Sequence, residues 1–79
     1  MPITITLYSK PACVQCDATK RKFAQLGIPY TEVDISQDEE ALAVLKAQGY
    51  LTAPVVVLSN GESWAGFRPD LIKYIKEGM

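Results

Sequence analysis

The sequence predicts an α/β fold in which three helices pack on a mixed four-stranded sheet, in the order β-α-β-α-β-β-α. Three patterns support this prediction. Apolar residues alternate with polar or aromatic ones over residues 3–8, as in a strand, and a helical period follows over residues 13–26. An apolar run at residues 55–58 precedes an Asn60-Gly61 turn, which is a strong hairpin signal. A helix between the first two strands makes them parallel, whereas the hairpin makes the last two antiparallel.

The first half of the chain is divided by turn and stop signals. Residues 9–12 contain a proline and form the turn between the first strand and the first helix. Gly27 ends that helix, because glycine readily adopts the left-handed conformation that closes a helix. Residues 30–35 then form the second strand.

The second helix has a start signal of its own. Ser36 and Glu39 have the S-x-x-E spacing of a capping box, in which both side chains bind backbone N–H groups at the helix start. The spacing predicts a helix over residues 37–48, which ends at Gly49.

The end of the chain reads as a short strand followed by a third helix. The strand is expected at residues 62–65. Pro69 suits the first turn of the helix, where its missing N–H costs no hydrogen bond. Leu71, Ile72 and Ile75 recur at helical spacing and form the face that we expect to be buried.

The composition indicates one small globular domain over residues 1–79. The chain is 48% apolar, and its 8 basic and 9 acidic side chains leave a formal net charge of −1, which argues against a nucleic-acid binder. The longest apolar run, at residues 53–58, is far shorter than the roughly 20 residues of a membrane span. The first residues also lack the basic and apolar regions of a secretory signal. We therefore expect a soluble, cytoplasmic monomer that binds neither nucleic acid nor membrane.

Two cysteines and no histidine restrict the chemistry. Catalysis of the Ser-His-Asp or Cys-His type is excluded, and the loop between Cys13 and Cys16 is too short to make a strong structural staple. A zinc site needs four ligands, which this chain does not offer, so we expect no bound metal. A Cu(I) carrier also places C-x-x-C after its first strand, but such domains run β-α-β-β-α-β and end on a strand. An inert buried pair is the remaining alternative.

The position of C-x-x-C at a helix start favours thiol–disulfide exchange. Unpaired backbone N–H groups and the helix dipole stabilise a thiolate over a thiol there. Lys10 adds a nearby positive charge, and Asp17 opposes it. We expect Cys13 to be exposed and to attack as the nucleophile. Cys16, almost one turn later, lies on the inner side of the helix and resolves the mixed disulfide formed at Cys13.

Pro54 gives a second signal, directly before the apolar run at residues 55–58. One interpretation is that the proline marks the first residue of a buried strand, where it is tolerated. The other is a cis Ala53–Pro54 bond that faces the cysteines. Such a bond exposes the backbone of Ala53 as an edge for an extended substrate segment.

These features together resemble a known family. C-x-x-C between strand and helix, and Thr-x-Pro at residues 52–54 before a buried strand, look like the thioredoxin fold in its short, glutaredoxin-like form. The motif C-V-Q-C at residues 13–16 and the segment W-A-G-F-R-P-D at residues 64–70 are similar to the NrdH-redoxin family. The resemblance spans essentially the whole chain.

The resemblance implies a dithiol electron carrier without a bound cofactor. Such a carrier reduces the large subunit of class Ib ribonucleotide reductase. It is re-reduced by thioredoxin reductase, so that NADPH is used only through that enzyme and glutathione is not the donor. By the same resemblance Cys13 is the attacking thiol, Cys16 the resolving thiol and Pro54 the cis-proline.

The segment at residues 64–70 offers a physical reason for this choice of donor. Glutaredoxins that hold glutathione have Gly-Gly and an acidic helix start here, whereas this chain has Ala65-Gly66 and a bulky Phe67. Arg68 puts a cation where the ammonium group of glutathione would lie. Trp64 and Phe67 would then form an apolar patch that docks a protein. Alternatively, both aromatic side chains pack in the core, and Arg68 is a surface cation or binds loop carbonyls.

The candidate partner-binding residues are therefore Lys10, Ala53, Pro54, Trp64, Gly66, Phe67 and Arg68. Two other functions stay open. A glutathione-dependent glutaredoxin is favoured by Lys10, Cys13 and the Thr-x-Pro motif. A binding module would be a soft-metal carrier or a glutathione-bridged iron–sulfur dimer.

Overall fold

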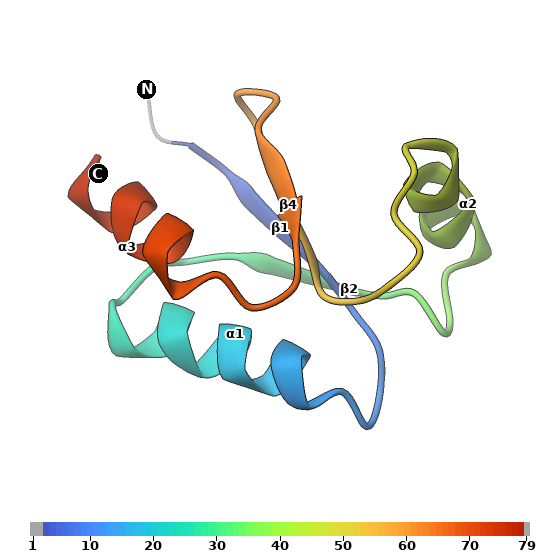
Figure 1. The fold of residues 1–79 in the computed structure, drawn as a ribbon, viewed down its shortest axis with the longest axis horizontal. Helices are drawn as coiled ribbons and strands as arrows, with labels where there is room; N and C mark the ends of the chain where they lie inside the picture. The colour runs from blue at the N-terminus through green and yellow to red at the C-terminus, as the bar shows by residue number, and fades with distance from the viewer. Residues whose placement is uncertain (1–2, 79) are drawn as a thin grey trace.

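The computed structural model describes residues 3–78 and has the predicted order of elements (Figure 1). These elements are β1 (Ile5–Ser9), α1 (Val14–Gln25), β2 (Thr31–Asp34), α2 (Glu39–Ala47), β3 (Val55–Leu58), β4 (Ser63–Ala65) and α3 (Pro69–Glu77). The strands form one sheet in the order β2-β1-β3-β4. β1 is parallel to β2, and the β1–β3 and β3–β4 pairs are antiparallel, so the predicted mixed sheet is confirmed.

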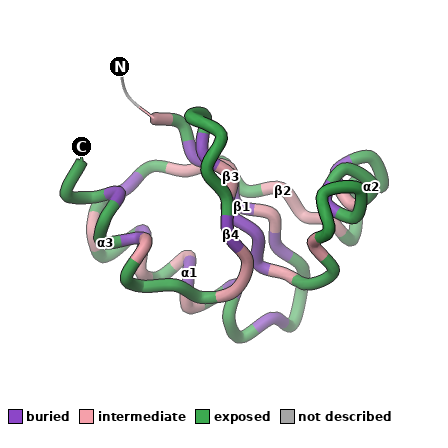
Figure 2. The backbone as a smooth tube through the Cα atoms, turned by 45° about the horizontal axis from the view of Figure 1, so that its top comes forward, coloured by how far each residue is buried: buried purple, intermediate pink, exposed green. Residues whose placement is uncertain are grey.

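The core lies between the sheet and the helix pair α1 and α3, which contact each other. α2 lies on the other side of the sheet (Figure 1). Figure 2 shows the buried segments gathered in the central strands and on the inner sides of the helices. The buried core cluster consists of Ile5, Leu7, Phe23, Ile28, Val56, Leu58, Trp64, Ile72 and Ile75. Within residues 3–78, no helix is long and apolar enough to cross a membrane.

The predicted capping box at the start of α2 is wrong. Asp38 is the N-cap, and its carboxylate accepts a hydrogen bond of 3.0 Å from the N–H of Ala41. Ser36 lies in the preceding turn, where its N–H and hydroxyl donate to Oδ1 of Asp34 at 2.9 and 2.6 Å. The carboxylate of Asp34 therefore holds the serine two residues before the N-cap. The other element bounds differ from the predictions by at most two residues.

Candidate active site

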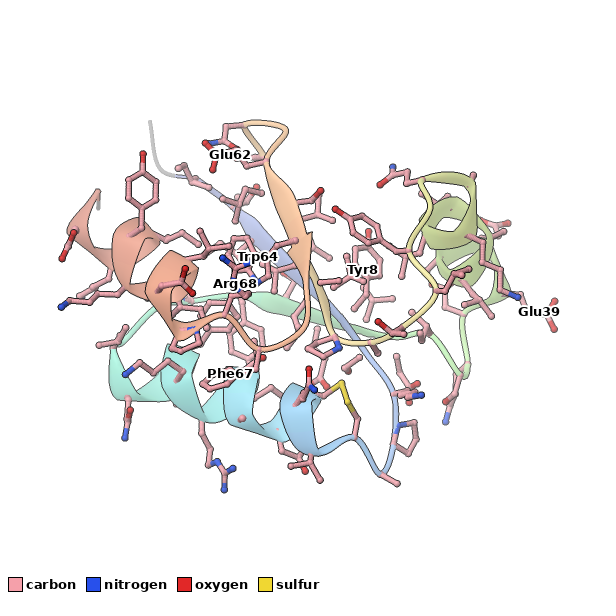
Figure 3. The ribbon with its side chains drawn as sticks, viewed as in Figure 1. Tyr8, Glu39, Glu62, Trp64, Phe67 and Arg68 are labelled. Carbon is pink, nitrogen blue, oxygen red and sulfur yellow. A yellow bond between two sulfur atoms is a disulfide. The ribbon has the colours of Figure 1, made fainter. Side chains whose placement is uncertain are left out.

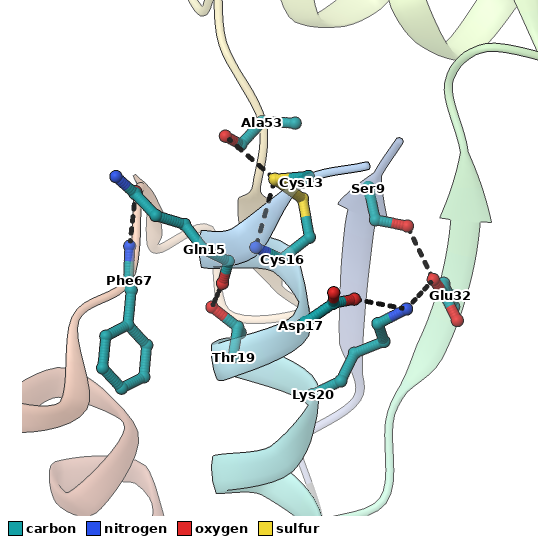
Figure 4. Close-up of a disulfide and its surroundings, with 10 residues drawn as sticks. All are labelled: Ser9, Cys13, Gln15, Cys16, Asp17, Thr19, Lys20, Glu32, Ala53 and Phe67. Carbon is teal, nitrogen blue, oxygen red and sulfur yellow. Dashed lines mark hydrogen bonds and ion pairs between the residues drawn. A yellow bond between two sulfur atoms is a disulfide. The ribbon is translucent and has the colours of Figure 1, made fainter. Parts of the chain in front are cut away.

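Cys13 and Cys16 form a disulfide at the N-terminus of α1, with their Cα atoms 5.2 Å apart (Figure 4). Cys13 is the N-cap of the helix in an extended conformation, and its Sγ accepts a hydrogen bond of 3.1 Å from the N–H of Cys16. Ala12, just before it, has a φ of 56°, a left-handed conformation that non-glycine residues rarely adopt. This tight turn carries the chain from β1 into the helix and presents Cys13 at its first turn.

The geometry suits a thiolate at Cys13 in the reduced protein. The Cys16 N–H is one of the N–H groups that a helix start leaves without an intrahelical partner, and it points at the Cys13 sulfur. A hydrogen bond of this kind to an ionised acceptor is stronger than one to a neutral acceptor. The helix dipole acts in the same direction.

Cys13 is less exposed than we predicted. Its exposed fraction is 8%, against 0% for Cys16. A residue 40 positions later in the chain contributes to this burial, since the carbonyl oxygen of Ala53 is 3.8 Å from Cys13 Sγ. The order of exposure is as expected, since Cys13 is the more exposed residue of the two and Cys16 is fully buried.

The loop before β3 contacts both the disulfide and the loop that follows β4. The Ala53–Pro54 peptide bond is cis. Pro54 is buried, and its carbonyl oxygen accepts a hydrogen bond of 2.8 Å from the N–H of Gly66. Two segments that are distant in the sequence, around Ala53 and around Gly66, are therefore joined beside the sulfur atoms.

Gln15 is part of the site, and the sequence reasoning missed it. Its Oε1 accepts a hydrogen bond of 3.3 Å from the N–H of Phe67, so the residue between the cysteines reaches the loop after β4. In Figure 4, Ala53 and the Gln15–Phe67 pair flank the disulfide. A Cβ placed on Gly66 would lie 3.3 Å from the same Oε1, and the φ of Gly66 is 85°. The conformation and the close approach both favour glycine there.

The two aromatic residues of the W-A-G-F-R-P-D segment lie in different surroundings. Trp64 is 8% exposed and belongs to the core cluster, and its indole N–H is buried without a hydrogen-bond partner. Phe67 is 36% exposed and lies over α1 (Figure 3). The predicted docking patch therefore loses Trp64, which fills the core, and retains Phe67 on the surface.

Arg68 binds a side chain instead of the loop carbonyls. Its Nε and Nη2 donate to Oδ1 and Oδ2 of Asp70 at 3.2 and 3.1 Å. This hydrogen bonding lowers the pKa of the Asp70 carboxyl. The paired charges occupy the start of α3, so neither ion is left alone there.

Lys10 lines a cavity of about 260 Å³ that the sequence did not reveal. Ala53 lines the same cavity, which therefore lies beside the disulfide. Its other walls are mostly apolar and come from the segment between β2 and α2, from α2 and from the loop after it. They are Ile35, Ser36, Leu42, Leu45, Lys46, Tyr50, Leu51 and Thr52.

A polar network joins α1 to the sheet on the side of the helix opposite the Gln15–Phe67 pair (Figure 4). The hydroxyl of buried Ser9 donates to Glu32 Oε2 at 2.7 Å, and Lys20 Nζ lies 3.1 Å from the same oxygen and 3.6 Å from Asp17. The hydrogen bond from Ser9 is the main reason that the pKa of Glu32 is lowered, and Lys20 contributes. Within residues 3–78 there is no group of three or more His, Cys, Asp or Glu residues that could hold a metal ion.

A disulfide at a helix N-terminus, beside a cis-proline loop on this fold, defines a thiol–disulfide oxidoreductase of the thioredoxin-like class. The glutaredoxin family model matches residues 5–64. The chain is 43% identical over 68 residues to the glutaredoxin-like protein NrdH of Escherichia coli (strain K12), a match covering 86% of this chain and 83% of that protein. It is 31% identical over 66 residues to NrdH of Lactococcus lactis subsp. cremoris, covering 84% and 90%.

The solved structure of NrdH-redoxin from Escherichia coli, described as glutaredoxin-like with a thioredoxin-like activity profile, superposes with a TM-score of 0.86. The match has 41% sequence identity and covers 90% of this chain and 92% of that one. The thioredoxin-like protein BC3987 gives a TM-score of 0.80 at 27% identity, covering 91% and 99%. The chain belongs to the glutaredoxin family and, within it, to the NrdH-redoxins.

Proposed function

We propose that this chain is a cytoplasmic dithiol carrier that transfers electrons from NADPH-dependent thioredoxin reductase to the large subunit of class Ib ribonucleotide reductase. The observation that carries the proposal is the Cys13–Cys16 disulfide at the start of α1. The Cys16 N–H donates a hydrogen bond to Cys13 Sγ, and Ala53 and the Gln15–Phe67 pair flank the disulfide. The carrier works as a monomer. It binds no cofactor, because the two sulfur atoms themselves store the electrons.

The reduction of a partner disulfide takes two exchange steps. The Cys13 thiolate attacks one partner sulfur, a mixed disulfide forms, and the other partner sulfur leaves and takes up a proton. The Cys16 thiol then loses its proton and attacks Cys13 Sγ. This step forms the intramolecular disulfide and releases the second partner sulfur, which is protonated in turn. The partner has gained two electrons and two protons, and the chain is left oxidised for the reductase.

The groups that surround the disulfide favour a protein as donor over glutathione. A small peptide ligand needs unoccupied hydrogen-bonding groups and charges close to the sulfur. The Phe67 N–H is already bound by Gln15, and the Asp70 carboxylate is already bound by Arg68. The backbone of Ala53 and the exposed ring of Phe67 suit an extended protein segment and an apolar contact.

The donor assay is the first test. Oxidised protein is mixed with thioredoxin reductase and NADPH, and the loss of NADPH absorbance is followed. We expect rapid NADPH consumption, and none with the Cys13→Ser variant. A parallel reaction with glutathione, glutathione reductase and NADPH should be slow. Fast reduction by glutathione with no reduction by thioredoxin reductase would instead establish a glutathione-dependent glutaredoxin.

The acceptor needs a separate measurement. The complete system is supplemented with class Ib ribonucleotide reductase and a ribonucleoside diphosphate, and deoxyribonucleotide formation is measured. Product that depends on Cys13 and Cys16 supports the proposal. NADPH consumption without deoxyribonucleotide would refute ribonucleotide reductase as the acceptor while leaving the donor assignment intact.

A further inference from the structure

A cationic groove runs along the outer face of α1, on the side of the loop that follows β4. It has a volume of about 360 Å³ and is lined by Ala18, Arg21, Lys22, Gln25 and Phe67; we call it the α1 groove. The four helical residues recur at spacings of three and four, so they form one stripe on the helix. The ring of Phe67 closes the other side (Figures 3 and 4).

The stripe of helical residues that lines the α1 groove continues toward the disulfide through Val14. Val14 lies one helical turn before Ala18 on the same stripe, is 80% exposed and follows Cys13 directly. From Val14 to Arg21 the helix rises by about 11 Å, at 1.5 Å per residue. The surface is therefore apolar close to the sulfur atoms and becomes cationic about 11 Å farther along.

The two cations of the groove have no acidic partner within residues 3–78. Arg21 and Lys22 take part in none of the ion pairs there, and no carboxylate lines the groove. Lys20, between them and the disulfide, is bound by Glu32 and Asp17 on another side of the helix. Two positive charges along one groove, on exposed Arg21 and half-buried Lys22, favour a negatively charged occupant.

We propose that the α1 groove receives an acidic segment of the redox partner, in which carboxylate side chains follow the reactive cysteine by three or four residues. An extended chain advances about 3.3 Å per residue, so three or four residues span the distance from the disulfide to Arg21 and Lys22. An apolar side chain of the same segment packs between Val14 and Phe67. The inference rests on the proposed function, and it adds a charge preference to the partner.

The test uses two synthetic peptides that contain the same intramolecular disulfide. In one, the third and fourth residues after the second cysteine are glutamates, and in the other they are glutamines. The protein is first reduced with dithiothreitol and freed of it, and the rate at which it reduces each peptide is measured. Neither thioredoxin reductase nor ribonucleotide reductase is present, so failure of this experiment is distinct from failure of the proposed function.

The wild-type protein should reduce the glutamate peptide faster than the glutamine peptide, and added salt should remove the difference. The variant Arg21→Glu/Lys22→Glu should lower the rate with the glutamate peptide about five- to tenfold, the size expected for two surface ion pairs lost and reversed. It should change the rate with the glutamine peptide less than about twofold. Arg21→Gln/Lys22→Gln is the milder second variant, with a loss of about threefold.

The matched control is Lys73→Glu/Lys76→Glu, which changes the net charge equally on exposed residues of α3 outside the groove. This control should retain most of the wild-type preference for the glutamate peptide. Equal losses in the two charge-reversed variants would show an effect of overall charge and overturn the proposal. A wild-type protein that reduces both peptides at the same rate, or dimerises through the groove in light scattering, would overturn it as well.

Discussion

The contact between Gln15 and the loop after β4 can be tested through Gly66. The substitution Gly66→Ala places a Cβ 3.3 Å from Gln15 Oε1, at a residue whose φ is 85°. Two costs follow. The left-handed conformation disfavours an L-residue, and the amide of Gln15 must move away from the N–H of Phe67.

The structure contains a control that separates these costs. Gly49 has a φ of 89°, and a Cβ there meets no atom within 4 Å. Gly49→Ala therefore carries only the conformational cost, about 1–2 kcal/mol, reduced by about 0.4–1 kcal/mol because alanine restricts the unfolded chain. Gly66→Ala carries the same net cost of about 1 kcal/mol, and the disturbed hydrogen bond adds about 0.5–1 kcal/mol. In a domain of this size the extra term lowers the Tm by about 4 °C relative to Gly49→Ala.

Thermal and urea unfolding of the oxidised protein measure both variants. Gln15→Ala and the double variant Gln15→Ala/Gly66→Ala complete a double-mutant cycle. Because the crowding disappears with the glutamine side chain, the double variant should be more stable than the sum of the single effects predicts, by about 0.5–1 kcal/mol. Equal destabilisation at Gly66 and Gly49, with no coupling to Gln15, would refute the role assigned to this contact.

Three further results are expected. Cys16→Ser should trap a partner as a mixed disulfide through Cys13, visible on a non-reducing gel, whereas Cys13→Ser should be inactive and trap nothing; the reverse pattern would invert the assigned roles. The pKa of Glu32 lies below its ordinary value of 4.5, so the stability it contributes is present above pH 4.5 and is lost as the pH falls through the lowered pKa. Unfolding of Glu32→Gln should therefore depend less on pH in that acidic range, and parallel pH profiles would contradict the role of the Ser9 hydrogen bond. Ala12→Gly should raise stability by about 0.5 kcal/mol, because glycine removes the strain of a φ of 56°, and a loss measured by urea unfolding would count against that strain.

The order of elements and the positions of the two sulfur atoms could be predicted because both depend on local patterns. Periodicity defined the strands and helices, and the C-x-x-C placement put Cys13 at the start of α1. The near burial of Cys13 could not be predicted, since Ala53 covers it from a distant part of the chain. The capping prediction failed for a different reason. Asp38 and Ser36 are both good N-caps, and only the carboxylate of Asp34 decides between them.

The contact between Gln15 and the loop after β4 could not be predicted from the sequence, for a geometric reason. Nothing in C-V-Q-C indicates that the side chain of its glutamine reaches the N–H of Phe67, 52 residues away. The sequence could not decide whether Trp64 is buried, for a similar reason. β4 has only three residues, and whether its tryptophan faces the core depends on the register with β3, in which Trp64 lies opposite Val56.

The position of β2 gives the network around Glu32 a second consequence. Within the described sheet, β2 is an edge strand that pairs only with β1, so one row of its backbone groups is open to another chain. Natural proteins discourage strand addition at such edges with charged side chains. β2 carries Glu32 and Asp34, and the pKa values of both carboxyls are lowered, so the edge keeps its negative charges in mildly acidic solution. Protonation of these two groups is expected to remove the electrostatic barrier to intermolecular sheet formation, so any aggregation in acid is expected to begin at this edge strand.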